Sequence, residues 1–255
     1  MELSNRDKAE AIQNSIETES LAEIGLLSPT SYKQHNPNVA TGLKSILDLH
    51  EQMPMDKVYT NVIRKFQDGD YGFVHVDYFL FEPTVAFDIH RFENGISVEH
   101  WDNLQFNSKN LNKSGRTMTD GKTKAKDHHK TETNKSIAQQ FVQDVLINGQ
   151  IDLAANYFEE DELIQHNPEM GDGVKEFLNT MEQWKREGQP QIYHKIHKVL
   201  GEGNFVLVIS EGSFKREHVA FYDLYRIEKD KIVEHWDVIE LIPEPEKRKN
   251  DNGKF

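Results

Sequence analysis

The chain of 255 residues is predicted to be an α+β protein with two tandem domains, and two observations lead to this fold class. First, Gln-His-Asn-Pro at 34–37 recurs at 165–168, and Val-Glu-His-Trp-Asp at 98–102 recurs at 233–237. Ordered matches of this kind, one of them containing a Trp, indicate a tandem duplication. Second, each copy places segments with helical spacing before segments with strand alternation, which is the order typical of α+β domains.

The predicted domain boundaries follow from a polar joint between the two copies. Residues 108–135 contain almost no large apolar side chain, and they carry eight Lys and Arg against three acidic residues. We therefore predict a first domain at 1–107, a basic linker at 108–134 and a second domain at 135–255. A polar, glycine-containing joint is either a flexible linker or a pair of long arms lying on the domains.

The elements are clearest in the second copy. Apolar residues at helical spacing predict one helix from Ile137 to Leu146, a short one after Asp152 and another from Val174 to Trp184. An antiparallel meander follows, with strands predicted at 192–200, 205–210, 218–227 and 232–242. The first copy has the same order, and its first helix is predicted around residues 9–22.

Composition excludes several classes of protein. Because cysteine is absent, the chain has no disulfide framework, Cys-ligated metal or thiolate nucleophile, which favours the cytoplasm as its location. The net charge of −13 argues against nucleic acid and anionic membranes as partners. No apolar run approaches the roughly 20 residues of a membrane span, and the start of the sequence lacks the features of a signal peptide.

The repeated strands bring acidic and imidazole side chains to one face. Alternation places His100 and Asp102 on one side of the last strand of the first copy, and Asp88 on the matching side of the preceding strand. We expect His75 to join them from the next strand. Carboxylates and imidazoles in a partly apolar pocket are suited to general acid–base chemistry. The alternative is structural: Asp88 and Asp102 would pair with Arg91, His100 or backbone amides and hold the sheet together.

The remaining repeated residues also allow two interpretations. Proline after Asn restricts the backbone, so His35 and His166 point in a defined direction, either to the pocket mouth or into a loop between helices. Trp101 and Trp236 lie on the opposite strand face from the Asp residues, where packing against helices or a partner is expected.

Metal and nucleotide chemistry have weaker support in the sequence. His35, His75, His100 and Asp102 have donor atoms that zinc or iron accepts, but no His-Glu-x-x-His pattern is present. The second copy has Ile209 and Ser210 where the first has His75. We therefore expect neither a metal nor an organic cofactor. A glycine-rich phosphate loop after a strand and a Gly-x-Ser-x-Gly motif are also absent from the sequence.

The order of these motifs resembles the SnoaL-like family of the nuclear transport factor 2-like superfamily. The resemblance rests on Gln-His-Asn-Pro, the Asp-x-x-Arg segments at 88–91 and 223–226 and the Glu-His-Trp-Asp segments, and it covers about residues 1–107 and 131–245. It implies two cystatin-like α+β cones, each a curved antiparallel sheet wrapped around helices with a deep pocket inside. Family cyclases close rings by aldol condensation without metal or organic cofactor.

The resemblance also implies roles for individual residues. Asp102 and Asp237 match the acid–base Asp of the cyclases, and Asp88 and Asp223 stand where the cyclases carry His. The full catalytic candidates are Asp102, His100, Asp88, His75, Asp237, His235 and Asp223. The ligand-binding candidates are His35, His166, Arg91 and Arg226. We expect the first copy to be the better equipped one, because it has His75 and Asp77 on its central strand.

Together these observations predict a cofactor-independent acid–base enzyme that acts on a small, apolar carbonyl compound. The alternative is a module that binds a small apolar molecule without turnover, or a structural pair with filled cones. Because superfamily members often pair through their sheets, the two copies are expected to form an intramolecular pseudo-dimer. Further homo-oligomerisation is left open.

Overall fold

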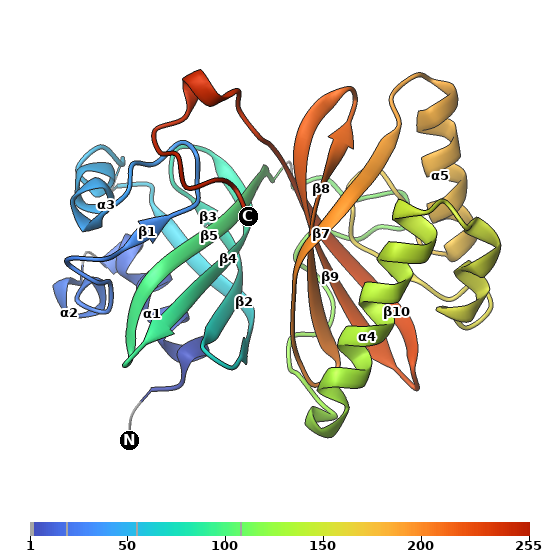
Figure 1. Ribbon diagram of the computed structural model, residues 1–255, viewed down its shortest axis with the longest axis horizontal. Helices are drawn as coiled ribbons and strands as arrows, with labels where there is room; N and C mark the ends of the chain where they lie inside the picture. Colours follow the sequence, from blue (N-terminus) through green and yellow to red (C-terminus); the bar gives the residue numbers. More distant parts are fainter. Residues whose placement is uncertain (1–2, 19, 55, 108) are drawn as a thin grey trace. The chain divides into compact units, whose positions relative to one another are not determined.

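The computed structural model describes residues 3–18, 20–54, 56–107 and 109–255 of the chain. The chain divides into two compact units: the first unit holds Met1–Ser108 and Ile242–Phe255, and the second unit holds Lys109–Leu241. Each unit has a five-stranded sheet with helices (Figure 1), which confirms the predicted α+β class. Most of the polar segment between the copies therefore belongs to the second unit, and the last part of the second copy belongs to the first unit.

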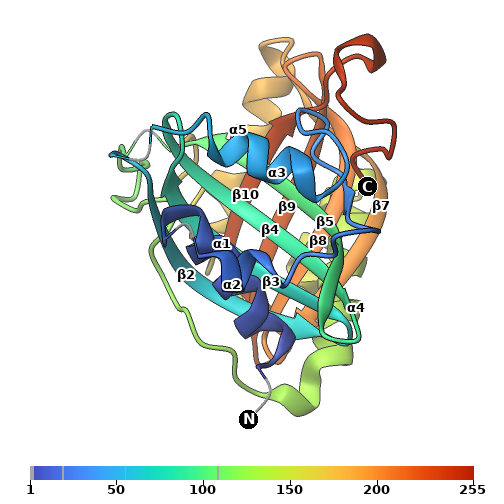
Figure 2. The same cartoon turned by 90° about the vertical axis from the view of Figure 1, so that its left-hand side faces the viewer.

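The first unit contains helices on one side of its sheet (Figure 2). Its elements are α1 (Asn5–Thr18), α2 (Leu21–Ile24), β1 (Lys33–Gln34), α3 (Leu43–His50), β2 (Tyr59–Asp68), β3 (Tyr71–Phe79), β4 (Pro83–Glu93), β5 (Ile96–Phe106) and, after the second copy, the short helix η4 (Pro245–Lys247). The strand order is β1-β5-β4-β3-β2. Strand β1 is parallel to β5, and the other neighbours are antiparallel.

The second unit repeats this topology. Its elements are η1 (His128–Lys130), α4 (Thr131–Phe141), η2 (Val142–Ile147), η3 (Ile151–Asn156), β6 (Ile164–Gln165), α5 (Val174–Arg186), β7 (Gln191–Glu202), β8 (Phe205–Phe214), β9 (Glu217–Glu228) and β10 (Lys231–Leu241). The strand order is β6-β10-β9-β8-β7, with β6 parallel to β10. The four predicted antiparallel strands are thus present, and a short parallel strand is added at the sheet edge.

The first helix differs from the prediction at both ends, since α1 begins at Asn5 and ends at Thr18. The start is explained by Ser4, whose Oγ accepts a hydrogen bond from the backbone N of Asp7 at 3.3 Å and donates to the Asp7 carboxylate at 2.5 Å. A Ser in this position satisfies amide groups that the first helical turn leaves without partners.

The last hairpin of each unit has a two-residue turn and, close to it, a shift of the strand register. Asn94 and Gly95 have φ of 51° and 81°, and Lys229 and Asp230 have φ of 51° and 63°. Two successive positive φ values are those of a type I′ turn, whose twist matches that of antiparallel strands. A register shift between Arg91 and Phe92 then brings Asp88 opposite Asp102, and a shift between Ile232 and Glu234 brings Asp223 opposite Asp237.

The core of the second unit lies between the sheet and its helices. Helix α5 buries Val174, Phe177, Thr180 and Trp184, which recur every three or four residues and therefore form one stripe. The rings of Phe177 and His235 are 6.4 Å apart, so His235 points to the helix side of the sheet.

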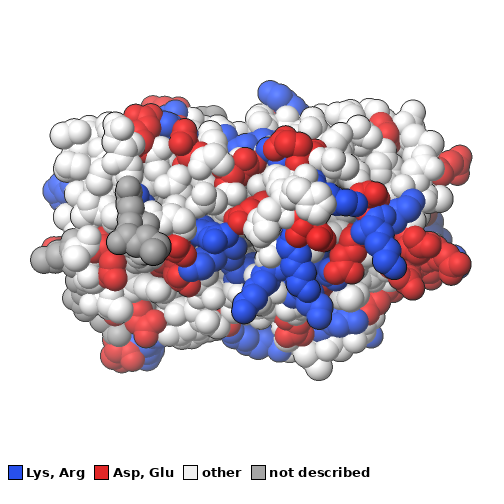
Figure 3. All heavy atoms as spheres, turned by 90° about the horizontal axis from the view of Figure 1, so that it is seen from below, with Lys and Arg blue, Asp and Glu red and all other residues white. Residues whose placement is uncertain are grey.

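Two observations concern membrane-spanning helices and the charge of one face of the molecule. Within the described residues, no helix is both long and apolar enough to span a membrane. On the face seen in Figure 3, Lys and Arg side chains lie among Asp and Glu side chains. This face therefore lacks the continuous basic stripe that is typical of nucleic-acid-binding proteins.

Candidate functional site

The structure brings Asp88, His100 and Asp102 together on strands β4 and β5. Asp88 lies opposite Asp102 in the register, and the Nε2 of His100 is 3.0 Å from Oδ1 of Asp88. The second unit repeats this arrangement with Asp223, His235 and Asp237. There Asp223 lies opposite Asp237, and Nε2 of His235 is 2.9 Å from Oδ1 of Asp223. We call each group of three residues an Asp-His-Asp cluster.

A glutamine from the short parallel strand determines that Nδ1 of each imidazole carries a proton. In the second unit, Oε1 of Gln165 accepts hydrogen bonds from the backbone N of His166 at 2.9 Å and of Asn167 at 3.0 Å. The same oxygen is 3.1 Å from Nδ1 of His235. Because Oε1 can only accept, Nδ1 of His235 carries a proton and donates it. One further proton lies between Nε2 of His235 and Asp223. The pair is therefore either an imidazolium with a carboxylate or a neutral imidazole with a carboxylic acid.

The first unit has the same hydrogen bonds in the matching places. Oε1 of Gln34 accepts from the backbone N of Asn36 at 2.9 Å and lies 3.0 Å from Nδ1 of His100. His100 is therefore protonated at Nδ1 for the same reason. This agreement between the units indicates that the orientation belongs to the repeated motif.

An asparagine holds the second carboxylate of each cluster. Nδ2 of Asn167 donates to Oδ2 of Asp237 at 2.7 Å, while its Oδ1 accepts from the backbone N of Glu169 at 2.8 Å. In the first unit Asn36 donates to Oδ2 of Asp102, also at 2.7 Å. The asparagine thus leaves the other oxygen of the carboxylate for a different partner.

Burial controls the charge of these carboxylates. It raises the pKa of Asp237 from the ordinary value of 3.8 to about 6; His235 opposes this rise, and the negative charge of Asp223 adds to it. Burial likewise raises the pKa of Asp88, against the effect of His100. Oδ2 of Asp223 and Oδ1 of Asp237 are buried and have no hydrogen-bond partner among the described residues. Such atoms are costly to bury when charged, so Asp237 changes its protonation near neutral pH.

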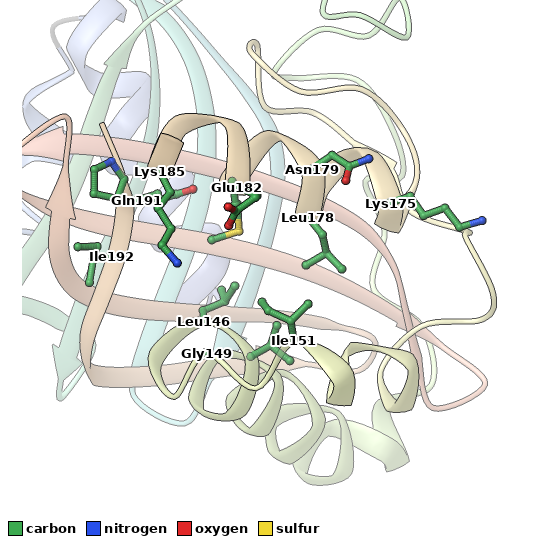
Figure 4. Close-up of a pocket in the computed structure, with 13 residues that line it drawn as sticks. Leu146, Gly149, Ile151, Lys175, Leu178, Asn179, Glu182, Lys185, Gln191 and Ile192 are labelled. Atoms are coloured by element: carbon green, nitrogen blue, oxygen red, sulfur yellow. The ribbon is translucent and has the colours of Figure 1, made fainter. Parts of the chain in front are cut away.

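In the second unit, a polar chain connects the cluster to a cleft. Tyr193 donates its hydroxyl proton to Oδ1 of Asp223 at 3.2 Å, and Nε2 of Gln191 donates to the Tyr193 hydroxyl at 3.3 Å. Gln191 is also part of the wall of a cleft of about 790 Å³ between η2, α5 and the start of β7 (Figure 4). Its apolar lining includes Val145, Leu146, Ile151, Leu178, Met181 and Ile192. A volume of this size is typical of small-molecule pockets.

His75 does not join the cluster, and this prediction is corrected. Val74 lies opposite Asp88, while His75 lies opposite Phe87. Because side chains alternate along a strand, His75 points to the other face of the sheet, where it contacts Arg64. The argument that His75 makes the first copy the better equipped one is therefore wrong as well.

The predicted ligand-binding residues also lie on that other face. Nε2 of His35 is 2.8 Å from Oε1 of Glu99, and Nε of Arg91 donates to Oε2 of Glu99 at 2.9 Å. The His35 ring stacks on Trp101, with centroids 4.6 Å apart. The second unit has the same two contacts to a glutamate and the same stacked rings, formed by His166, Glu234, Arg226 and Trp236. The structure thus assigns His35, His166, Arg91 and Arg226 to ion pairs on the sheet rather than to the clusters.

The sequence prediction missed the residues that hydrogen-bond to the clusters. These are Gln34 and Asn36 in the first unit and Gln165 and Asn167 in the second. The signal was present in the repeated Gln-His-Asn-Pro motif, because alternation sends Gln and Asn to one side and His to the other. Tyr193 and Gln191 have no such signal, since neither lies in a repeated motif.

The imidazole nitrogen and the carboxylate oxygens of each cluster are also suitable ligands for a metal ion. In each cluster, one imidazole nitrogen and two carboxylate oxygens lie within 4.8 Å of one another. In the described arrangement, however, Nε2 of each imidazole is hydrogen-bonded to an Asp of its own cluster. Of the donors considered from the sequence, His35 and His75 lie outside the clusters.

Comparisons with known proteins find one matching family and several similar solved structures. Residues 136–244 match the SnoaL-like polyketide cyclase family. No curated protein matches the chain. Among solved structures, an NTF2-like protein of unknown function from Cytophaga hutchinsonii is 14% identical, with a TM-score of 0.36, and the match covers 41% of this chain and 93% of that one.

Two further solved structures are similar over less than half of this chain. An NTF-2 like protein of unknown function from Burkholderia xenovorans is 14% identical with a TM-score of 0.37, over 45% of this chain and 89% of that one. TsrD from Streptomyces laurentii is 14% identical with a TM-score of 0.33, over 39% of this chain and 86% of that one.

Proposed function

We propose that the protein is a cofactor-independent acid–base enzyme for small apolar carbonyl compounds, because residues 136–244 match the SnoaL-like polyketide cyclase family. The reaction is an aldol condensation, a cyclisation or an isomerisation. The observation that carries this proposal is the buried Asp-His-Asp cluster of the second unit. It combines a carboxylate whose pKa is raised to about 6 with an imidazole that shares a proton with Asp223.

In the proposed reaction, Asp237 moves the proton. As a carboxylate, its free Oδ1 takes a proton from the carbon next to the substrate carbonyl. The proton shared by His235 and Asp223 passes to the carbonyl oxygen, so that a neutral enol forms without a separated charge. In a condensation, the enol carbon attacks a second carbonyl carbon, and protonated Asp237 gives its proton to the new oxygen. The enol hydroxyl returns its proton to the pair of His235 and Asp223 as its own carbonyl re-forms, so the cluster regains its starting state. General acid–base catalysis of this kind contributes about 10²–10⁴-fold to a rate.

The apolar cleft supports the substrate class. Its lining is dominated by aliphatic side chains, and its polar residues include Gln191, which is hydrogen-bonded to Tyr193 and through it to Asp223. An apolar compound gains by leaving water for such a lining, while its carbonyl group can accept a hydrogen bond. In the first unit we propose the same roles for Asp102, His100 and Asp88.

The second candidate is a module that binds an apolar molecule without turnover. It is favoured by the depth of the cluster, because Asp237 is only 4% exposed and Asp223 is fully buried. A ligand in the cleft would then contact Gln191 and never reach the carboxylates.

Asp237→Asn separates the two candidates, with Asp152→Asn, an exposed carboxylate of the same unit, as the matched control. Binding and product formation are measured for a panel of small ketones, aldehydes and diketones by calorimetry and proton NMR. The enzyme proposal predicts that Asp237→Asn retains affinity and loses about 10²-fold or more of the turnover. If ligands bind and no compound shows turnover that depends on Asp237 or Asp102, the protein is a binding module.

Two further predictions remain part of this proposal. The cysteine-free composition supports a location in the cytoplasm. The duplication supports an intramolecular pseudo-dimer of the two copies.

A further inference from the structure

The donor atoms of the second Asp-His-Asp cluster are close enough together to hold one metal ion. One imidazole nitrogen of His235 and one carboxylate oxygen each from Asp223 and Asp237 lie within 4.8 Å of one another. All three residues are buried, with exposed fractions of 4% or less. Zinc holds nitrogen and oxygen ligands at about 2.0–2.2 Å, so small rotations of these side chains bring all three donors into its coordination sphere.

The hydrogen bonds around the cluster are of the kind that orient metal ligands. Nδ1 of His235 donates to Oε1 of Gln165 at 3.1 Å, which directs Nε2 towards the carboxylates. Nδ2 of Asn167 donates to Oδ2 of Asp237 at 2.7 Å. Histidines and carboxylates that bind metals in proteins are commonly held by outer partners in this way. Two of the three ligands are therefore oriented before an ion binds.

Two carboxylate oxygens of the cluster are left for a further partner. Oδ2 of Asp223 and Oδ1 of Asp237 are buried and have no hydrogen-bond partner among the described residues. Two ionised carboxylates and an imidazolium leave one net negative charge in this buried place. A divalent ion that replaces the proton on Nε2 of His235 makes the cluster neutral and gives the oxygens a partner, which lowers the cost of burying them.

The first cluster has the same three kinds of donor and, in addition, a neighbouring cation. Nζ of Lys254 is 3.6 Å from Oδ1 of Asp102, and the two side chains are only 2% and 8% exposed. This Oδ1 is the oxygen of Asp102 that accepts no hydrogen bond, so the ammonium group lies beside an oxygen that a metal ion would use. Two cations that are close together and buried repel each other. Among the described residues, neither Asp223 nor Asp237 has a Lys or Arg side chain within ion-pair distance.

We propose that the second Asp-His-Asp cluster binds one Zn²⁺ ion through His235, Asp223 and Asp237, and that Lys254 prevents the first cluster from binding one. Three protein ligands leave a fourth position of the zinc ion open. Binding releases the proton on Nε2 of His235 to the solvent. The binding itself does not depend on the proposed acid–base function. Because Nε2 cannot hold zinc and the shared proton at once, zinc acts as an inhibitor of that reaction and not as its cofactor.

The test measures Zn²⁺ binding by isothermal titration calorimetry to the full chain, after treatment with a chelator. We expect one zinc ion per wild-type chain. In Asp237→Asn and in His235→Ala the affinity should fall by about 100-fold or more, since loss of an outer partner alone costs about 10–100-fold. Lys254→Met should bind two zinc ions, whereas Lys249→Met, which changes an exposed lysine of the same segment, should still bind one.

His218→Ala is the matched control for the histidine, because another carboxylate and two imidazoles meet there. Nε2 of His197 and Nε2 of His218 lie 2.9 Å and 2.8 Å from the two carboxylate oxygens of Glu211. His218→Ala should keep the wild-type affinity for zinc. A wild-type chain that binds no zinc overturns the proposal, and so does a loss of binding in His218→Ala that Asp237→Asn does not show.

The remaining outcomes are also decisive. Two zinc ions on the wild type, or one on Lys254→Met, overturn the role of Lys254. If His235→Ala does not fold, Asp237→Asn decides, because it keeps the shape of the side chain. The titration needs no substrate, so zinc binding without any turnover refutes only the proposed function. Turnover in a chain that binds no zinc refutes only the zinc site.

Discussion

Replacing Asp237 by Asn should stabilise the protein at neutral and alkaline pH. The buried carboxyl has a folded-state pKa of about 6 against an ordinary value of 3.8. With 1.36 kcal/mol for each unit of pKa difference, ionised Asp237 costs about 3 kcal/mol of folding free energy. Asn retains an oxygen that can accept the hydrogen bond from Asn167, and it needs no charge.

The sign of the pH dependence follows from the raised pKa. Because the folded state holds this proton more tightly than the unfolded state, the stability that protonated Asp237 contributes is fully present below about pH 4. It is lost as the pH rises to the folded-state pKa of about 6. The advantage of Asp237→Asn over the wild type should therefore be small at pH 4 and approach about 3 kcal/mol at pH 8.

Urea unfolding followed by tryptophan fluorescence at pH 4, 6 and 8 measures this difference, and Trp236 on β10 reports on the second unit. The exposed carboxylate variant Asp152→Asn is the control, and it should show no such trend. The reasoning is refuted if Asp237→Asn is no more stable than the wild type at pH 8. It is also refuted if the gain is the same at all three pH values.

Three further variants test the fold around the site. Phe141→Ala removes a buried ring packed on Tyr225 and should lower the free energy of unfolding by about 3–5 kcal/mol, measured in urea. Gly212→Ala places a Cβ 2.0 Å from the carbonyl oxygen of Ile192, so β7 and β8 should separate and their amides should exchange faster. Arg116→Ala breaks the ion pair with Asp172, about one-third exposed, and should cost about 1 kcal/mol or less while cleavage within residues 109–127 becomes faster in limited proteolysis.

Each of these variants has an outcome that contradicts the structure. Wild-type stability of Phe141→Ala would mean that the ring is not in the core. Unchanged exchange of the β7 and β8 amides in Gly212→Ala would contradict their close approach. Equal protection of residues 109–127 in Arg116→Ala and the wild type would mean that this ion pair does not hold the segment.

Strand alternation was sufficient to place Asp88 and Asp102 on one face of neighbouring strands, and the repeat implies the same for Asp223 and Asp237. The two-residue turn alone would place Asp88 opposite Trp101, and the register shift between Arg91 and Phe92 brings Asp102 there instead. The face of each residue can therefore be read from the sequence, whereas the residue that lies opposite it is known only from the structure.

The position of His75 could not be read in the same way. Its face depends on the register of β3 against β4, which places Val74 opposite Asp88. A shift of one residue exchanges the two faces, and the strongly apolar residues on both sides of β3 give no signal to choose between them.

Contacts from distant parts of the chain were beyond sequence reasoning altogether. Lys254 contacts Asp102, which lies more than half of the sequence away. Tyr193 on the edge strand β7 contacts Asp223 on β9, two strands away. Both contacts depend on tertiary packing. The repeated Gln-His-Asn-Pro motif is the exception, since alternation alone would have assigned Gln34 and Asn36 to the cluster.

The central claim is that Asp237 moves a proton at the carbon next to a carbonyl group. Incorporation of deuterium from D₂O into a small apolar ketone, followed by mass spectrometry, measures this step without requiring a complete reaction. The account predicts incorporation above the buffer rate that rises with pH around the Asp237 pKa of about 6. In Asp237→Asn it should fall by about 10²-fold or more. Incorporation at the buffer rate in the wild type, or equal incorporation in Asp237→Asn, would contradict the claim.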